Sequence, residues 1–60
     1  MTTKQKCLGD LPNHEGFEFI GITRDDTEIR CIVKKDSVGF HRIYSNDVPV
    51  YHKLKSWRAK

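Results

Sequence analysis

A chain of 60 residues can form one small domain and no more, and a domain of this size buries only about 60% of the surface that its unfolded chain exposes. Apolar residues make up 37% of the sequence and cluster with strand-like spacing, which excludes wholesale disorder. No run approaches the roughly 18 apolar residues that span a bilayer, and the N-terminus leads into no signal-peptide core. We therefore expect a cytoplasmic protein.

The net charge of +3 is unevenly distributed along the chain. Residues 1–50 hold seven Lys or Arg side chains against eight acidic ones, a net charge of −1. Residues 51–60 hold four cations and no acid, a net charge of +4. The excess positive charge of the protein therefore belongs to its C-terminal segment.

Residues 1–16 are predicted to form a flexible N-terminal arm, and residues 17–60 a single β-rich domain. The arm is polar and is interrupted by Gly9, Pro12 and Gly16. Leu8 and Leu11 are the apolar side chains that would anchor it. Chain ends are usually ordered only where such contacts tie them down.

Two strands joined by a tight loop are predicted over residues 17–35. If Asp25 and Asp26 form the whole loop, alternate residues of the two strands share one apolar face. The side chains on this predicted core face are Ile20, Ile22, Ile29, Cys31 and Val33. The other face is polar, with Phe19 and Ile32 at its centre. Because two aspartates form a mirror-image hairpin turn less readily than Asp-Gly, a longer loop is the alternative.

A turn over residues 36–39 and a strand over residues 40–44 would complete a three-stranded antiparallel meander. Ser45, Asn46 and Asp47 are good N-caps, and Val50, Leu54 and Trp57 then recur at i, i+4 and i+7. We predict a small α+β fold in which a short C-terminal helix covers the core face. The alternative is an all-β fold with a fourth strand over residues 48–51, because Val and Tyr favour strands and Pro is tolerated at a sheet edge.

Catalysis and metal binding are not predicted, and neither is a cofactor. The potential zinc ligands are His14, His41, His52, Cys7 and Cys31. None of them forms the close pair that structural zinc sites use, and the two cysteines are expected to be free thiols. The predicted register turns Cys31 inward, where a thiol is unreactive. A domain of this size also leaves little room for a substrate pocket.

The basic C-terminal segment predicts a nucleic-acid-binding protein. Cations interleaved with aromatic side chains offer contacts for phosphates and stacking faces for bases, a combination typical of single-strand binders. Two arginines on the strands would add phosphate contacts. The predicted contact residues are Lys53, Lys55, Arg58, Lys60, Arg30, Arg42 and Trp57. The alternative for Trp57 is that it packs into the core while the lysines keep the helix soluble.

A protein-binding adaptor or inhibitor is the alternative function. A three-stranded sheet has two open edges, and such an edge can pair with another chain. Phe17, Phe19 and Ile32 would add an apolar patch on the less buried face. A homodimer would cover an edge and add stability. Salt separates the two functions, because nucleic-acid binding weakens steeply with ionic strength.

The overall make-up resembles a group of known proteins. A flexible arm, a hairpin-rich centre over residues 16–44 and the basic end Tyr51-His52-Lys53-Leu54-Lys55-Ser56-Trp57-Arg58 resemble small accessory proteins encoded in bacteriophage early regions. Such proteins commonly bind DNA or host proteins. Three antiparallel strands followed by a helix are also similar to the small DNA-binding domains of some integrases, which lay the sheet in the major groove. These resemblances imply a regulatory or accessory role and transfer no site residue.

Overall fold

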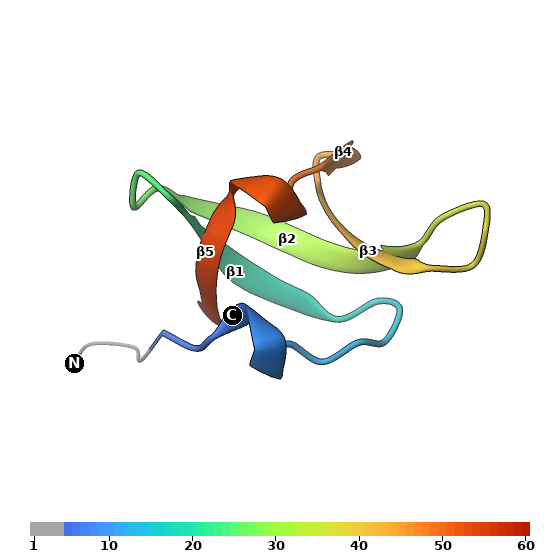
Figure 1. The fold of residues 1–60 in the computed structure, drawn as a ribbon, viewed down its shortest axis with the longest axis horizontal. Coiled ribbons are helices and arrows are strands. Elements are labelled where there is room, and N and C mark those ends of the chain that lie inside the picture. Colours follow the sequence, from blue (N-terminus) through green and yellow to red (C-terminus); the bar gives the residue numbers. More distant parts are fainter. Residues whose placement is uncertain (1–4) are drawn as a thin grey trace.

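The computed structural model describes residues 5–60, which form one antiparallel sheet of five strands (Figure 1). The strands are β1 (Glu18–Thr23), β2 (Glu28–Lys35), β3 (His41–Ser45), β4 (Val48–Pro49) and β5 (Leu54–Ala59). Two 3-10 turns, η1 (Leu8–Asp10) and η2 (Tyr51–Lys53), precede β1 and β5. The strand order is β4-β3-β2-β1-β5, so the first three strands run in the predicted meander order and β5 returns to the far side of β1.

The predicted C-terminal helix is wrong, and the α+β class with it, because residues 54–59 form β5. Ile22 pairs with Ser56 and Thr23 with Leu54, which leaves Lys55 as the extra residue of a β-bulge. The bulge brings Leu54 and Trp57, three positions apart, onto the same face. In a regular strand residues at this spacing point to opposite faces, so the pattern imitated a helix.

The segment that was expected to cap the helix instead forms a hairpin turn. Asn46 and Asp47 have φ angles of 52° and 64°, and Ser45 pairs with Val48 on either side of them. Two consecutive residues with positive φ define the mirror-image turn that suits a two-residue hairpin loop, and Asn and Asp tolerate this conformation. The all-β alternative was therefore nearer to the structure, although its fourth strand is limited to Val48–Pro49.

The first hairpin has a loop one residue longer than the two-aspartate loop. Thr23 donates its backbone N–H to Thr27 O at 2.9 Å, and Asp26 donates to Thr23 O at 2.9 Å. Asp26 takes a φ of 69° to close the loop. The three loop residues are therefore 24–26, and the extra residue shifts the pairing of the two strands by one.

This shift reverses the two faces of β1. Phe19 now lies opposite Cys31, and Gly21 lies opposite Ile29. The register confirms Ile29, Cys31 and Val33 on the core face and places Ile20 and Ile22 on the other face, so the predicted face of these two residues is wrong. Ile22 is nevertheless buried as predicted, with 1% of its surface exposed. Phe19, which was expected at the centre of the polar face, is a core residue with 1% of its surface exposed.

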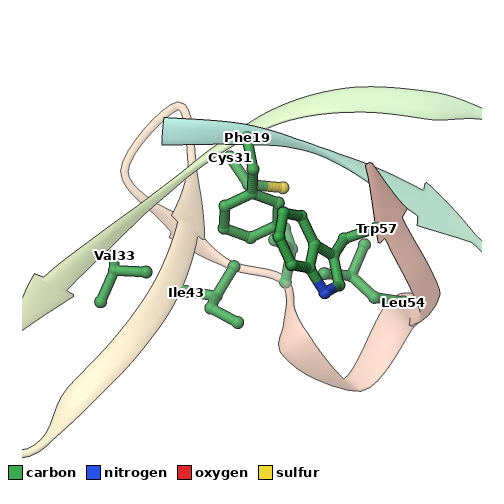
Figure 2. Packing of buried hydrophobic residues seen from close by; sticks show 7 residues of the cluster. Phe19, Cys31, Val33, Ile43, Leu54 and Trp57 are labelled. Atoms are coloured by element: carbon green, nitrogen blue, oxygen red, sulfur yellow. The ribbon is translucent and has the colours of Figure 1, made fainter. Parts of the chain in front are cut away.

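The core lies between the sheet and the segments that fold over it (Figure 2). Its buried residues are Phe19, Cys31, Val33, Ile43, Val50, Leu54 and Trp57. The Trp57 ring meets the Phe19 ring edge to face, with the centroids 5.7 Å apart and an interplanar angle of 75°. Both cysteines are free thiols, and burial raises the pKa of the Cys31 thiol, which keeps it protonated at neutral pH.

The described part of the arm is attached to this core. Leu8 and Leu11, the predicted anchors, pack against it. Lys6 forms a two-way backbone bridge with Trp57, with N–O distances of 2.6 and 3.0 Å. Residues 1–4 of the predicted arm lie outside the described residues. Within residues 5–60 no helix has the length and apolar character needed to cross a membrane.

A substitution at Gly21 tests how closely β1 and β5 pack. A Cβ atom at this position would lie 2.8 Å from both Cys31 Sγ and Leu54 Cδ2. We expect Gly21→Ala to lower the free energy of unfolding by about 1–3 kcal/mol, the usual cost of overpacking a core. Gly9→Ala is the matched control, because a Cβ there would meet nothing within 4 Å. Urea midpoints measure both variants, and equal midpoints would contradict the close β1–β5 packing.

Candidate nucleic-acid interface on the outer sheet face

The side of the sheet opposite the core is called the outer face. Strand parity and register assign to it one set of alternating side chains from four strands. These residues are Glu18, Ile20, Ile22, Glu28, Arg30, Ile32, Lys34, Arg42, Tyr44, Ser56 and Arg58. Ile22 is buried, with 1% of its surface exposed, so the accessible apolar centre of the outer face consists of the half-buried Ile20, Ile32 and Tyr44 among charged groups.

Three of the predicted contact residues meet on this face. Ile20 lies opposite Arg30 on one side and opposite Arg58 on the other, so the two arginines flank one isoleucine. Arg42 lies opposite Lys34 on the next pair of strands. Cross-strand neighbours have their Cβ atoms within about 5.5 Å, so Lys34 and Arg42 adjoin each other. Arg30 and Arg58 are separated by β1, and Arg30 lies four positions from Lys34 along β2, so the four cations are spread over the face.

Acidic side chains from other parts of the chain offset much of this charge. Arg58 binds Glu28 through two hydrogen bonds of 3.1 and 2.8 Å, and Lys34 binds Asp47 at 2.8 Å. Arg42 pairs with Asp36, and Lys60 with Glu18. The five cations Arg30, Lys34, Arg42, Arg58 and Lys60 therefore face four acids, a local net charge of +1. Arg30 is the one of the five with no ion-pair partner among residues 5–60.

These pairs keep the acids ionised. The Lys60 ammonium lowers the pKa of Glu18, and the Arg58 guanidinium lowers the pKa of Glu28. The Asp36 carboxylate accepts a hydrogen bond from Arg42 and two more from the backbone N–H groups of Val38 and Phe40, at 3.0 and 2.9 Å. These bonds, above all that from Arg42, lower its pKa to about 2. Asp36 thereby holds the β2–β3 turn and orients the guanidinium of Arg42.

A shallow hollow of about 240 Å³ lies on the outer face. Its polar lining comes from Glu18, Arg30, Asn46 and Lys60, and Ile32 and Tyr44 supply apolar surface. Two cations beside an aromatic ring provide what a nucleotide needs, namely charge for its phosphate and a flat face for its base. The Asn46 amide adds a donor and an acceptor for a base edge.

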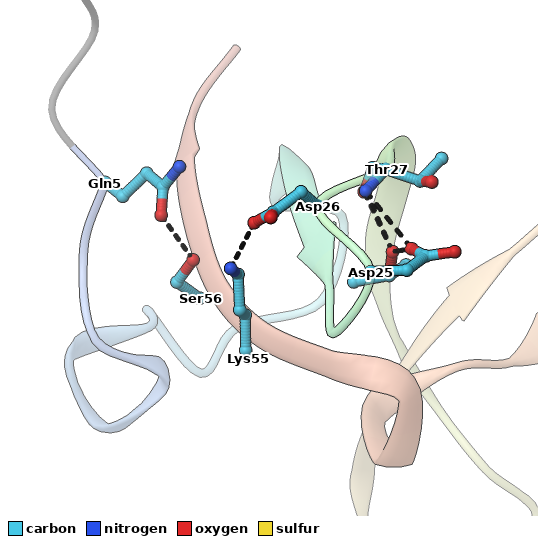
Figure 3. Close-up of polar contacts among 7 residues, drawn as sticks. Gln5, Asp25, Asp26, Thr27, Lys55 and Ser56 are labelled. Carbon is cyan, nitrogen blue, oxygen red and sulfur yellow. Dashed lines mark hydrogen bonds and ion pairs between the residues drawn. The ribbon is translucent and has the colours of Figure 1, made fainter.

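Three of the predicted contact residues are not part of this group. Trp57 has 3% of its surface exposed, and its indole Nε1–H donates to Cys7 O at 2.9 Å. Trp57 therefore packs into the core, which was the alternative to a nucleic-acid contact, and its ring presents no face to solvent. Lys55 pairs with Asp26 at the tip of the first hairpin (Figure 3). Lys53 lies in η2, where its carbonyl accepts the N–H of Arg24 at 3.1 Å.

Tyr44, Lys34 and Asn46 were not predicted for the site. Tyr44 follows Arg42 by two positions in the same strand, so strand parity alone places both on one face. The alternation of side chains along β2 likewise places Lys34 on the outer face, two positions from Ile32. Asn46 lies in the β3–β4 turn, and only the folded chain brings it beside Arg30.

Comparisons of this chain with protein-family models, curated proteins and solved structures give no significant match. Residues 5–60 also contain no group of three His, Cys, Asp or Glu side chains placed to hold a metal ion.

The stability of the protein at low pH tests the role of Asp36. The pKa of Asp36 is about 2 in the folded protein, against an ordinary value of 3.8. The stabilisation from its ion pair is therefore complete above pH 3.8 and is lost as the pH falls through about 2. Between pH 4 and pH 2 the free energy of unfolding should fall further for the wild type than for Asp36→Asn. Asp10→Asn is the control, because Asp10 makes no side-chain hydrogen bond within residues 5–60. Thermal unfolding at several pH values measures the difference, and parallel curves for wild type and Asp36→Asn would contradict it.

Proposed function

We propose that the chain is a non-enzymatic accessory or regulatory protein that binds single-stranded nucleic acid through the outer face of its sheet. The supporting observation is the grouping of Arg30, Lys34, Arg42 and Arg58 around an apolar centre that includes Tyr44. The proposed interface is centred on the sheet and keeps Arg58 and Lys60 from the C-terminal segment. Lys53, Lys55 and Trp57 are not part of it.

Exposed ion pairs can be exchanged for contacts with phosphate. Solvent-exposed pairs contribute little to stability, typically about 0–1 kcal/mol, and Glu28 and Asp47 are more than half exposed at their side chains. A phosphate that approaches Arg58 or Lys34 can therefore displace the acid at small cost. Arg30 needs no such exchange, and it is the cation expected to make the first contact.

The aromatic ring favours a single strand as the ligand. In a duplex the bases are stacked on one another, whereas an unpaired base can lie on an aromatic side chain. Tyr44 and Ile32 offer this surface beside Arg30 and Lys60. Because Glu18 and Glu28 remain on the same face, binding should be weak and depend strongly on salt.

Arg30→Gln tests the proposal, with Lys35→Gln as the matched control. Both residues are exposed on β2 and both changes remove one charge, but Lys35 lies on the face opposite Arg30. We expect Arg30→Gln to weaken binding of a labelled mixed-sequence oligonucleotide of about 12 nucleotides by about tenfold, equivalent to about 1.4 kcal/mol. Lys35→Gln should change it by less than about twofold. Fluorescence anisotropy between about 50 and 200 mM salt should also give a smaller salt slope for Arg30→Gln, by about 0.7. Equal losses in the two variants, or no binding of wild type at low salt, would refute the outer-face interface.

Tyr44→Leu separates stacking from charge. Leucine retains the apolar bulk but not the aromatic face, so affinity for the same oligonucleotide should fall about fivefold or more, within the range of one lost base stack. The salt slope should stay unchanged, because no phosphate contact is removed. Tyr51→Leu is the control, since Tyr51 lies in η2 and is 55% exposed outside the outer face. A fall in the salt slope for Tyr44→Leu would contradict the stacking role.

A further inference from the structure

Two cations that the outer face does not use lie next to each other at the end of the sheet, beside the first hairpin loop. Thr23 and Leu54 are the last paired residues of β1 and β5. The pairing continues by one step, because Arg24 donates its backbone N–H to Lys53 O at 3.1 Å. Residues that oppose each other in this way have their Cβ atoms about 4.5–5.5 Å apart. The fold therefore brings the side chains of Arg24 and Lys53 close together.

Neither of these two cations has an ion-pair partner among residues 5–60. Two acids of the neighbouring chain are engaged elsewhere, since Asp26 pairs with Lys55 (Figure 3) and Glu28 pairs with Arg58. Like charges opposite one another destabilise a sheet. The two cations are therefore held together with no ion pair, within the described part of the chain, to offset their repulsion.

Both cations line one shallow hollow of about 540 Å³. The other residues that line it are Thr23, Asp25, Thr27, Ile29 and His52. A neutral imidazole keeps one N–H donor, and a protonated imidazole offers two. The hollow thus presents a guanidinium, an ammonium and an imidazole to the same ligand.

Asp25 is the one acid that lines the hollow, and its Oδ1 atom is used within the hairpin loop. This atom accepts hydrogen bonds from the hydroxyl of Thr23 and from the backbone N–H of Thr27, the latter at 3.2 Å (Figure 3). The bonds from Thr23 and Thr27 lower the pKa of Asp25, so this carboxyl is ionised at neutral pH. The three charges of Arg24, Lys53 and Asp25 sum to +1, and the hollow favours an anion.

A phosphate group suits these side chains. A guanidinium binds two phosphate oxygens through parallel N–H groups, and a lysine ammonium adds a point charge. A phosphomonoester carries a charge of about −1.5 to −2 at pH 7, whereas a phosphodiester carries a single negative charge. The two adjacent cations therefore match a phosphomonoester better than the backbone of a nucleic acid.

We propose that the hollow lined by Arg24, Lys53 and His52 binds the phosphate group of a phosphomonoester. Two sources share this chemistry, namely a small phosphorylated ligand and the terminal phosphate of a nucleic-acid strand. Only the second source depends on the proposed nucleic-acid interface, because the hollow uses none of the cations of the outer face.

Inorganic phosphate, titrated into the ¹⁵N-labelled full chain, tests the site. The backbone signals of Arg24 and Lys53 should shift and saturate, and chloride at the same ionic strength should leave them unchanged. Arg24→Gln and Lys53→Gln should each weaken phosphate binding about tenfold. Lys35→Gln is the matched control, because Lys35 is also exposed and has no ion-pair partner among residues 5–60, and it should change binding by less than about twofold. Equal losses in the three variants, or equal shifts with chloride, would overturn the proposal.

Asp25→Asn gives a test with the opposite sign. Asparagine keeps an oxygen that can accept the N–H of Thr27 but removes the negative charge from the hollow. Phosphate should therefore bind about two- to fivefold more tightly to Asp25→Asn than to the wild type. Unchanged or weaker binding in the folded variant would place the phosphate outside the hollow and overturn the proposal.

Two further ligands distinguish the sources. Adenosine 5′-monophosphate represents a small phosphorylated ligand, and a 3′-labelled oligonucleotide of about 12 nucleotides, with and without a 5′-phosphate, represents a strand end. Tighter binding of the phosphorylated oligonucleotide by the wild type but not by Arg24→Gln would assign the strand end. Saturable binding of the mononucleotide without that gain would assign a small ligand, and the absence of both would refute the site. Arg30→Gln should leave the binding of inorganic phosphate unchanged, so this site and the outer-face interface can fail separately.

Discussion

Trp57 joins three segments of the chain that are far apart in the sequence. Its backbone bridges Lys6 of the arm, its indole N–H bonds Cys7 O, and it lies opposite Gly21 of β1. Its ring meets Phe17 and Phe19 edge to face. Because Gly21 has no side chain, the core between β1 and β5 can close at this point. The sheet, the arm and the last strand are therefore held by one residue and the space that it fills.

This packing decides which side chains are left for function. When Trp57 turns inward, Arg58 turns outward and joins Arg30 across β1. The bulge at Lys55 removes that lysine from the regular alternation, and it pairs with Asp26 instead. The basic segment is thus divided: part of it completes the fold, and part of it contributes cations to a face that the earlier strands build.

Strand β3 directs its side chains and its backbone groups to different neighbours. Arg42 and Tyr44 present side chains to the outer face, whereas the backbone C=O of Ile43 accepts the N–H of Val50. Strand geometry separates these directions by about a right angle, because side chains stand perpendicular to the hydrogen-bonding plane.

The sequence alone determined the three-stranded meander, the second turn with Gly39, and the core positions of β2, because these depend on alternation and turn residues within short stretches. It also raised the placement of Arg30 and Arg42 on one face, which the register shows. Three features needed the tertiary structure. The hairpin loop gained one residue and exchanged Phe19 for Ile20 in the core, since a single step in register turns every side chain over. The bulge in β5 gave a strand the spacing of a helix. The acids that offset the basic segment come from distant positions, as Glu18 and Glu28 show, because charge along a chain does not reveal which groups will face each other in space.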